Sequence, residues 1–249
     1  MNHSNKTNLL LSILFACLIS PVAFANNYQL GLYELNRGQF HKALAQFEPL
    51  AADGFSPAQY QLAMMYKNAL GVIKSEKKAF ELLTLAAKQN DSDAQFDLGV
   101  MYTEGNVVPK DLTKAFSLTH DAAKKGLASA QFNLAVMYYN GTGVHKDKHQ
   151  AARWYQKAAD QNYALAQFNL ALMYFDGEGL EQNTEMSFIW NTIAAYNGYN
   201  NAAKSRDMDA HKMSKIQVSQ SREKADAMYL KIVAQQELKA KKAAKNYHY

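Results

Sequence analysis

Polar side chains recur at two positions seven residues apart in four segments that are otherwise rich in apolar residues. The four pairs are Gln61 and Asn68, Asp97 and Glu104, Asn133 and Asn140, and Asn169 and Asp176. Seven residues make about two helical turns, so each pair lies on one face of a helix. Amide groups offer both a donor and an acceptor, which match the N–H and C=O groups of a peptide backbone. The pattern indicates either a peptide-binding face or an ordinary solvated helix face.

Aromatic side chains accompany the polar pairs in the last two of these segments, where Tyr139 precedes Asn140 and Phe175 precedes Asp176. Together they define the candidate binding residues Asp97, Glu104, Asn133, Tyr139, Asn140, Asn169, Phe175 and Asp176. If neighbouring repeats stack, packed helices should bring Asn133 and Asn169 within about 8 to 10 Å of each other. That spacing would suit successive parts of one extended ligand.

Residues that could carry catalysis do not form a recognisable constellation. His145 and His149 are four apart, as helical metal ligands can be, but Gly143 predicts a turn and Asp147 predicts a helix start between them. The sequence contains none of the patterns H-E-x-x-H, G-x-S-x-G or G-x-x-x-x-G-K. We therefore expect no catalytic residue, no cofactor and no metal site.

The elements that must position these side chains repeat every 36 residues. Alanine opens each copy at Ala58, Ala94, Ala130, Ala166 and Ala202. In the third copy Leu134 and Met137 continue an apolar stripe at i, i+4 and i+7, which predicts an amphipathic helix. Ala135 occupies a position that is small in the first four copies, so we expect a second helix to approach closely there. A period of about 20 to 50 residues is typical of solenoids, whose units must stack on one another.

A second helix should follow in each copy. Glycines such as Gly141 and Gly143 readily adopt positive φ and can reverse the chain. Asp111 and Asp147 are good N-cap residues for the second helix. These helices should end at residue types that tolerate the left-handed conformation, namely Asn90, Gly126, Asn162 and Gly198. Ala69 replaces the first turn glycine of its copy, and we expect a distorted turn there.

The run A-x-A-Q-F-N-L-A-x-M-Y-x-x-G-x-G-V-x-x-D, followed by A-x-x-W-Y-x-K-A-A, resembles the Sel1-like repeat (SLR) family, relatives of the tetratricopeptide repeat. The resemblance covers roughly 28–229 and is strongest over 94–180. It implies an all-α fold, a right-handed α-solenoid of antiparallel helix pairs whose first helices line a concave surface. Some family members have been described as penicillin-binding or β-lactamase-like, so binding or hydrolysis of cell-wall material is an alternative function.

The N-terminus has the pattern of a cleaved signal peptide. An apolar run from Leu9 to Ile19 is followed by Ala23-Phe24-Ala25, and we expect cleavage after Ala25. Processing as a lipoprotein at Cys17, the only cysteine, is the alternative. The apolar run is too short for a good permanent membrane span, so no transmembrane segment is expected in the mature chain. This reading predicts a periplasmic or secreted protein.

The remaining organisation follows from where the repeat begins and fails. The predicted order is a signal peptide over 1–25, an N-terminal capping unit over 26–57, repeats over 58–93, 94–129, 130–165 and 166–201, C-terminal capping helices over 202–238 and a basic flexible tail over 239–249. Within it, Lys215 to about Leu238 should form one long closing helix. After Ala203 lie 11 of the 27 basic but only 5 of the 22 acidic residues, so the positive charge is concentrated there.

These observations favour a non-catalytic exported repeat protein that acts as an adaptor or scaffold in the cell envelope. Its expected partner is another envelope protein or an extended peptide. Nucleic acid is not an expected partner, because export argues against it. The basic tail could make weak contact with anionic surfaces.

Overall fold

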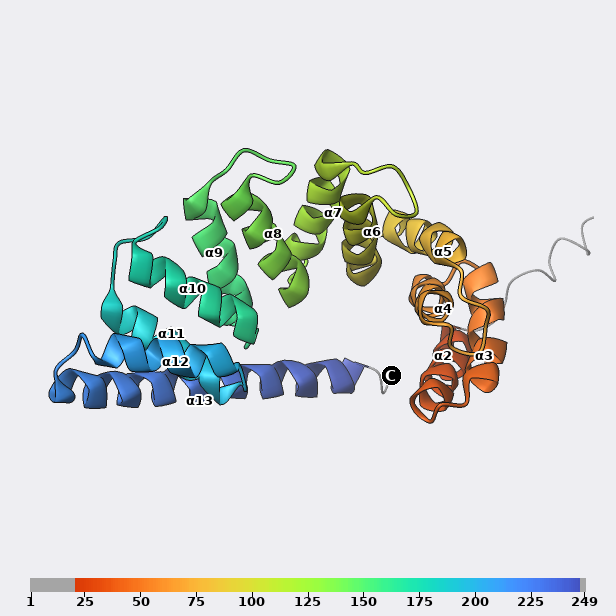
Figure 1. Cartoon of the computed structure of the whole chain (residues 1–249). Coiled ribbons are helices and arrows are strands. Elements are labelled where there is room, and N and C mark those ends of the chain that lie inside the picture. The colour runs from red at the N-terminus through yellow and green to blue at the C-terminus, as the bar shows by residue number, and fades with distance from the viewer. Residues whose placement is uncertain (1–20, 247–249) are drawn as a thin grey trace, which may run out of the picture. The chain divides into compact units, whose positions relative to one another are not determined.

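The computed structural model describes residues 21–246, with side chains described from 25 to 242. The described chain is built from helices, and it contains no strand within those bounds (Figure 1). The prediction of an all-α array of helix pairs is confirmed. Most of the predicted signal peptide, with Cys17, lies outside the described residues, and its expected cleavage site at Ala25 falls within the first described helix.

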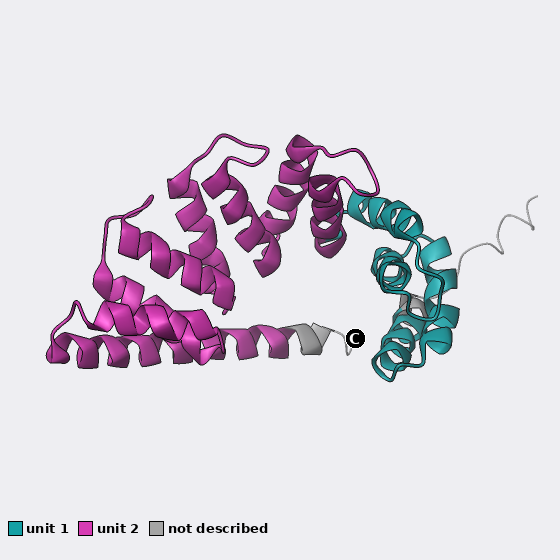
Figure 2. Cartoon of the chain, in the orientation of Figure 1, with its two compact units in different colours: residues 1–91 teal, residues 92–249 magenta. Residues whose placement is uncertain are grey.

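The chain divides into two compact units, residues 1–91 and 92–249 (Figure 2). In the first unit the helices are α2 (Pro21–Asn36), α3 (Phe40–Ala52), α4 (Ser56–Asn68) and α5 (Glu76–Lys88). In the second they are α6 (Ser92–Glu104), α7 (Leu112–Lys124), α8 (Ala128–Asn140), α9 (Lys148–Ala159), α10 (Ala164–Asp176), α11 (Thr184–Tyr196), α12 (Asn200–Ala210) and α13 (Lys215–Asn246). From α4 to α11, even-numbered helices are the first helices of the repeats, and each begins two residues before the alanine that opens the predicted copy.

The apolar stripe of the first helices forms the core, as predicted. In α8, Ala130, Leu134 and Ala135 are fully buried and Met137 is 7% exposed. The small position allows a close helix contact: a β-carbon added to Gly99 would lie 2.9 Å from Thr119 Oγ1 and 3.2 Å from the carbonyl oxygen of Ala115 in α7. In the second unit one core cluster contains buried residues of α7, α8, α9, α10, α11 and α13.

The caps of the second helices also agree with the sequence. Asp111 and Asp147 accept a hydrogen bond from the backbone N–H three residues further on, at 2.9 Å in both cases. Asn90 and Asn162 have φ values of 68° and 64° at the helix ends. The expected distortion at Ala69 is not found: this residue adopts the left-handed conformation with φ 57°, and its N–H bonds to the Met65 carbonyl as in the glycine turns.

A buried glutamine joins successive repeats, and sequence reasoning assigned it no role. Gln131 donates from Nε2 to the carbonyl of Ala123 at the end of α7, at 3.1 Å. Its Oε1 accepts from Gln161 Nε2, beyond the end of α9, at 2.8 Å. The same 3.1 Å bond to a preceding helix end is made by Gln59 to Ala51 and by Gln167 to Ala159.

The chain closes with two further helices. Ser214 and Gln217 form a capping box at the start of α13, with bonds of 2.9 and 3.2 Å. In α13, Ala225 and Ile232 are buried in the core cluster. α13 continues to Asn246, beyond the predicted helix end at about Leu238, so the basic stretch from 239 is helical over the described residues; lysine and alanine are strong helix formers even without packing partners. None of the described helices is long and apolar enough to cross a membrane.

The core assignment predicts unequal effects for two adjacent substitutions in α8. Leu134→Ala should lower the free energy of unfolding by about 2 to 5 kcal/mol, because it opens a cavity in a fully buried site. Asn133→Ala should cost well under that. Urea unfolding followed by circular dichroism measures both, and equal losses would contradict the assignment of core and polar faces.

The glutamine contact predicts the effect of Gln131→Leu. This substitution should remove the two hydrogen bonds of the buried amide while the leucine side chain keeps the apolar packing. At about 0.5 to 1.5 kcal/mol for each bond, the loss should be about 1 to 3 kcal/mol. Gln220→Leu, at an exposed position of α13, is the matched control and should change stability little. A Gln131→Leu protein as stable as the control variant would show that the buried amide does not hold the repeats together.

Candidate functional site

The predicted polar residues lie on α6, α8 and α10 of the second unit. We call these eight residues, Asp97, Glu104, Asn133, Tyr139, Asn140, Asn169, Phe175 and Asp176, the first-helix polar face. Asp97, Asn133 and Asn169 are half-buried at the earlier position, whereas Glu104, Asn140 and Asp176 are exposed at the later one. The helical period explains why these polar positions are not buried in the core: the apolar stripe on the opposite side of each helix faces the core instead.

The amide of Asn169 is already engaged in part. Its Nδ2 donates to the carbonyl of Leu165, one turn earlier in α10, at 2.7 Å. This local bond orients the side chain and leaves the amide oxygen with free acceptor capacity, since it has two lone pairs. At this position the face therefore offers an acceptor more readily than a donor.

A cavity of about 120 Å³ lies within this face, between α8, α9 and α10. It is lined by Tyr139, Tyr155, Asn169, Leu172, Met173, Asp176 and Glu178. The fold thus brings together three of the predicted residues, from two successive repeats. The other predicted residues do not line it. Tyr155 and Glu178 were not predicted, because Tyr155 reads as a core residue of a second helix and Glu178 as an ordinary turn residue.

Tyr139 and Glu178 join the two repeats at the edge of the cavity. The Tyr139 hydroxyl donates to Glu178 Oε2 in the turn after α10. Glu178 Oε1 also forms an ion pair with Lys148 Nζ at 2.5 Å. The hydrogen bonds from Lys148 and Tyr139 lower the pKa of Glu178, and the bond to Glu178 is the main cause that raises the pKa of Tyr139. Burial raises the pKa of Tyr155.

This arrangement is suited to binding rather than to nucleophilic chemistry. Both tyrosines keep their protons because their pKa values are raised, and Glu178 keeps its charge because its pKa is lowered. A nucleophile or base would need a pKa shifted in the opposite direction, toward neutral pH. The cavity thus presents two protonated tyrosine hydroxyl groups and the ionised carboxylate of Glu178, which can pair with polar groups of a ligand.

Phe175 faces a second, smaller cavity of about 70 Å³ between α10, α11 and α12. Its lining is Leu172, Phe175, Ser187, Asn191, Ser205, Met208 and Asp209. The ammonium group of Lys212 lies 3.8 Å from the centre of the Phe175 ring. Sequence reasoning missed this cavity, because α12 belongs to the degenerate fifth copy and Asp209 matches no position of the repeat.

The two histidines do not converge, as predicted. His145 lies in the loop before α9, whereas His149 is in the first turn of α9 and its Nδ1 lies 2.9 Å from the carbonyl oxygen of Gly179. Across the part of the chain that the structure describes, no group of three or more His, Cys, Asp and Glu residues is placed to hold a metal ion.

The pattern Ser-x-x-Lys, which serine β-lactamases use, occurs at 75–78 and 221–224. In the first, Ser75 is the N-cap of α5 and accepts from the Lys78 N–H. In the second, Ser221 and Lys224 both bond to Glu185, at 3.2 and 2.7 Å. The two hydroxyls therefore have structural partners, and the ammonium groups of Lys78 and Lys224 donate to Tyr66 and Glu185 rather than to the serines.

Comparison with known protein families identifies the same repeat. A family model described as the Sel1 repeat matches the four segments 56–91, 92–127, 128–163 and 164–199. Its boundaries lie two residues before those predicted from the alanines, with the same period. No curated protein matches the sequence.

Two solved structures are similar over most of the chain. One is a protective antigen of uropathogenic Escherichia coli strains that displays an SLR fold, with a TM-score of 0.76, 31% identity and 88% of this chain covered. This chain spans 48% of that protein's length. The other is a Sel1 repeat protein from Oxalobacter formigenes, with a TM-score of 0.66 and 24% identity, covering 70% of this chain and 72% of that one.

The lowered pKa of Glu178 predicts how its contribution to stability depends on pH. The carboxylate stabilises the fold above its ordinary pKa of 4.5, and this contribution is lost as the pH falls through the lower folded-state value. Glu178→Gln should therefore be less stable than the unmodified protein at pH 7, and the difference should shrink below about pH 4.5. Urea midpoints across this range measure it.

Glu181→Gln, an exposed carboxylate in the same turn, is the control for that measurement. It should change the urea midpoint little at either end of the range. A stability difference for Glu178→Gln that stays constant with pH would show that the pairing of Glu178 with Lys148 and Tyr139 does not stabilise the fold.

Proposed function

This chain belongs to the Sel1 repeat family, and we propose that it is a non-catalytic scaffold that binds an extended segment of another protein along the first-helix polar face. Sel1 repeat proteins generally mediate protein–protein interaction as scaffolds and are typically non-catalytic. The family supports the class of function. The location of the binding surface is argued from this chain's own residues.

The observation that carries the proposal is the recurrence of one polar pair on three successive first helices, beside a polar cavity. The pairs on α6, α8 and α10 each combine a half-buried and an exposed side chain seven residues apart. An ordinary solvated face does not require amide and acid groups at the same positions of successive repeats. Binding of a peptide backbone does favour such repetition, because the backbone offers N–H and C=O groups at a regular spacing.

The cavity between α8 and α10 gives this face a place for a side chain of the partner. Its volume of about 120 Å³ exceeds by several-fold the roughly 10 to 15 Å³ that one water requires. Leu172 and Met173 provide apolar walls, while Asp176 and Glu178 provide acceptors. A polar or basic side chain with an apolar stem would match this lining.

The proposal also includes the place of action. The leader pattern of residues 1–25 supports export, so the partner would be another protein of the cell envelope and the chain an adaptor there. Affinity capture from envelope extract, with the purified protein as bait and mass spectrometry as readout, identifies that partner. Recovery of no protein above background would count against the adaptor proposal.

The alternative of cell-wall chemistry is tested with the same purified protein. A chromogenic β-lactam and peptidoglycan fragments are incubated with it, and product formation is followed over time. The scaffold proposal predicts no turnover of either substrate. Turnover that a heat-denatured sample lacks would contradict the non-catalytic reading.

Substitution of two amides tests the binding face directly. Asn133→Ala combined with Asn169→Ala should weaken binding of the captured partner by about 1 to 3 kcal/mol, because buried partner groups lose their hydrogen bonds. Titration calorimetry measures the affinity, and circular dichroism should show unchanged helix content.

The matched control combines Gln220→Ala and Gln235→Ala, which remove two exposed amides from α13 instead. This variant should bind the partner as the unmodified protein does. Equal affinity of both double variants would place the binding surface elsewhere and leave the polar face as ordinary solvated surface.

A further inference from the structure

Asp209 of α12 is a buried carboxylate that forms no ion pair within the described part of the chain. It is 1% exposed, and its Oδ2 accepts hydrogen bonds from Ser187 Oγ at 2.8 Å and Asn191 Nδ2 at 2.9 Å. Burial raises the pKa of this carboxyl group, and the hydrogen bonds from Asn191 and Ser187, together with the charge of Lys212, only partly offset that effect. A buried carboxylate is costly to ionise unless a cation joins it.

Asp209 lines the 70 Å³ cavity between α10, α11 and α12. One water needs roughly 10 to 15 Å³, so the space suits a larger group. Leu172 and Phe175 form an apolar wall. Met208, which is 61% exposed, lies at the rim, so a ligand could enter past it and reach Asp209.

Asn191 provides a second, independent indication of a ligand. It lines the same cavity and is 1% exposed, yet its Oδ1 has no hydrogen-bond partner. Native proteins rarely leave a buried acceptor unpaired without a reason. The lining of the cavity therefore combines a carboxylate with an unpaired amide oxygen, and the complementary ligand is rich in N–H donors and positively charged.

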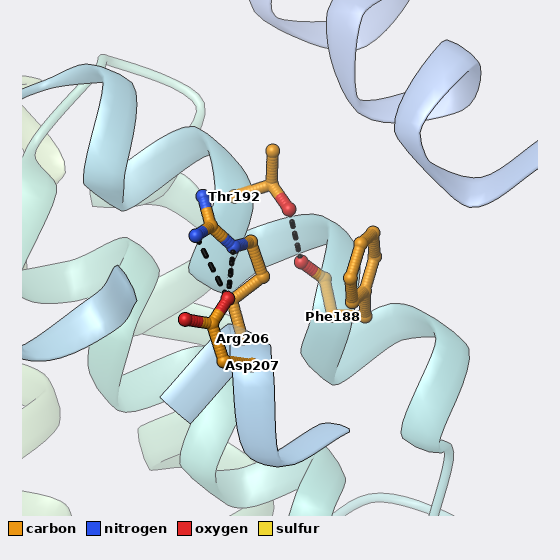
Figure 3. A network of polar contacts seen from close by, with 4 residues as sticks. All are labelled: Phe188, Thr192, Arg206 and Asp207. Atoms are coloured by element: carbon orange, nitrogen blue, oxygen red, sulfur yellow. Dashed lines mark hydrogen bonds and ion pairs between the residues drawn. The ribbon is translucent and has the colours of Figure 1, made fainter. Parts of the chain in front are cut away.

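Two neighbouring polar side chains, Asp207 and Thr192, have partners of a kind that Asp209 lacks. Asp207, two residues earlier in α12, is exposed and accepts from Arg206 Nε and Nη2 at 3.0 and 2.8 Å (Figure 3). The buried hydroxyl of Thr192 donates to the Phe188 carbonyl in its own helix at 2.7 Å (Figure 3). Asp209 is thus the carboxylate of α12 that lacks its own guanidinium or ammonium partner among the described residues.

We propose that this cavity binds an organic cation, an alkylammonium or guanidinium group, with its charged N–H donors on Asp209 and Asn191 and its apolar stem against Leu172, Phe175 and Met208. The Lys212 ammonium group, 3.8 Å from the Phe175 ring centre, shows that this aromatic wall already accommodates a cation. Small amines and the side chains of lysine and arginine carry such groups. The inference deepens the proposed function, on which its protein arm rests, by assigning the pocket to a basic residue of the partner.

Calorimetric titration of the purified full-length protein with butylguanidinium and butylammonium tests the pocket. The neutral analogue butylurea separates charge from shape. The unmodified protein should bind the two cations and bind butylurea at least about 10-fold more weakly, as expected for a charged hydrogen bond. Asp209→Asn should weaken cation binding by a similar factor, whereas Asp207→Asn should not change it.

Three results would overturn the pocket: no binding of either cation, equal binding of butylurea, or equal binding by Asp209→Asn. Each would leave the Asp209 carboxyl group with a structural role in the core only. Met208→Arg keeps the test decisive if Asp209→Asn does not fold, because Met208 is exposed and the substitution should be tolerated. Its tethered guanidinium should occupy the cavity, raise the thermal midpoint and block butylguanidinium, and unchanged binding would contradict the proposal.

A short peptide with one arginine, compared with the same peptide carrying glutamine, distinguishes the source of the cation. Competition with butylguanidinium by the arginine peptide alone supports a side chain of a protein partner. Failure of the arginine peptide to compete would overturn that arm and leave a free amine as the ligand. The Asn133→Ala and Asn169→Ala variant should bind butylguanidinium normally, so the pocket and the polar face can fail separately.

Discussion

The register between successive repeats depends on one buried amide in each repeat. The last carbonyl groups of a helix have no partner within it. At the end of α7 the Ala123 carbonyl accepts both the N–H of Gly126, at 3.0 Å, and the side chain of Gln131 from the next first helix. A buried glutamine must find partners for both ends of its amide, so it tolerates little sliding of one repeat on another. Apolar packing alone is less directional.

The same helices that carry these glutamines carry the polar face. Gln131 and Asn133 are two residues apart in α8, so fixing the inner side of this helix also fixes where its outer side chains point. In the fifth copy Ala203 stands where the glutamine would be. There α12 makes its buried polar contact with α11 through Asp209, which accepts from Ser187, instead of through a glutamine. This substitution leaves a buried carboxylate and a cavity at the end of the array.

The helix pairs, their caps and their core could be predicted because each is encoded locally and repeated. Leu134 and Asp147, for example, act through spacing and capping within a single copy. The cavities could not be predicted, because the contacts of Tyr139 with Glu178 and of Asp209 with Ser187 join different helices and do not recur in each repeat of the described chain. The helical end of α13 was missed for a different reason: its lysines and alanines favour helix without an apolar face to reveal it.

The proposed function places protein partners on the first-helix side of the second unit. Site-specific photocrosslinking tests this most directly, with benzoylphenylalanine placed either at Asn140 in α8 or at Arg153 in α9, both exposed. Each variant is expressed in cells, irradiated and purified, and covalent adducts are identified by mass spectrometry. The account predicts an adduct with another protein from position 140 and none from position 153. Adducts from position 153 alone would contradict it.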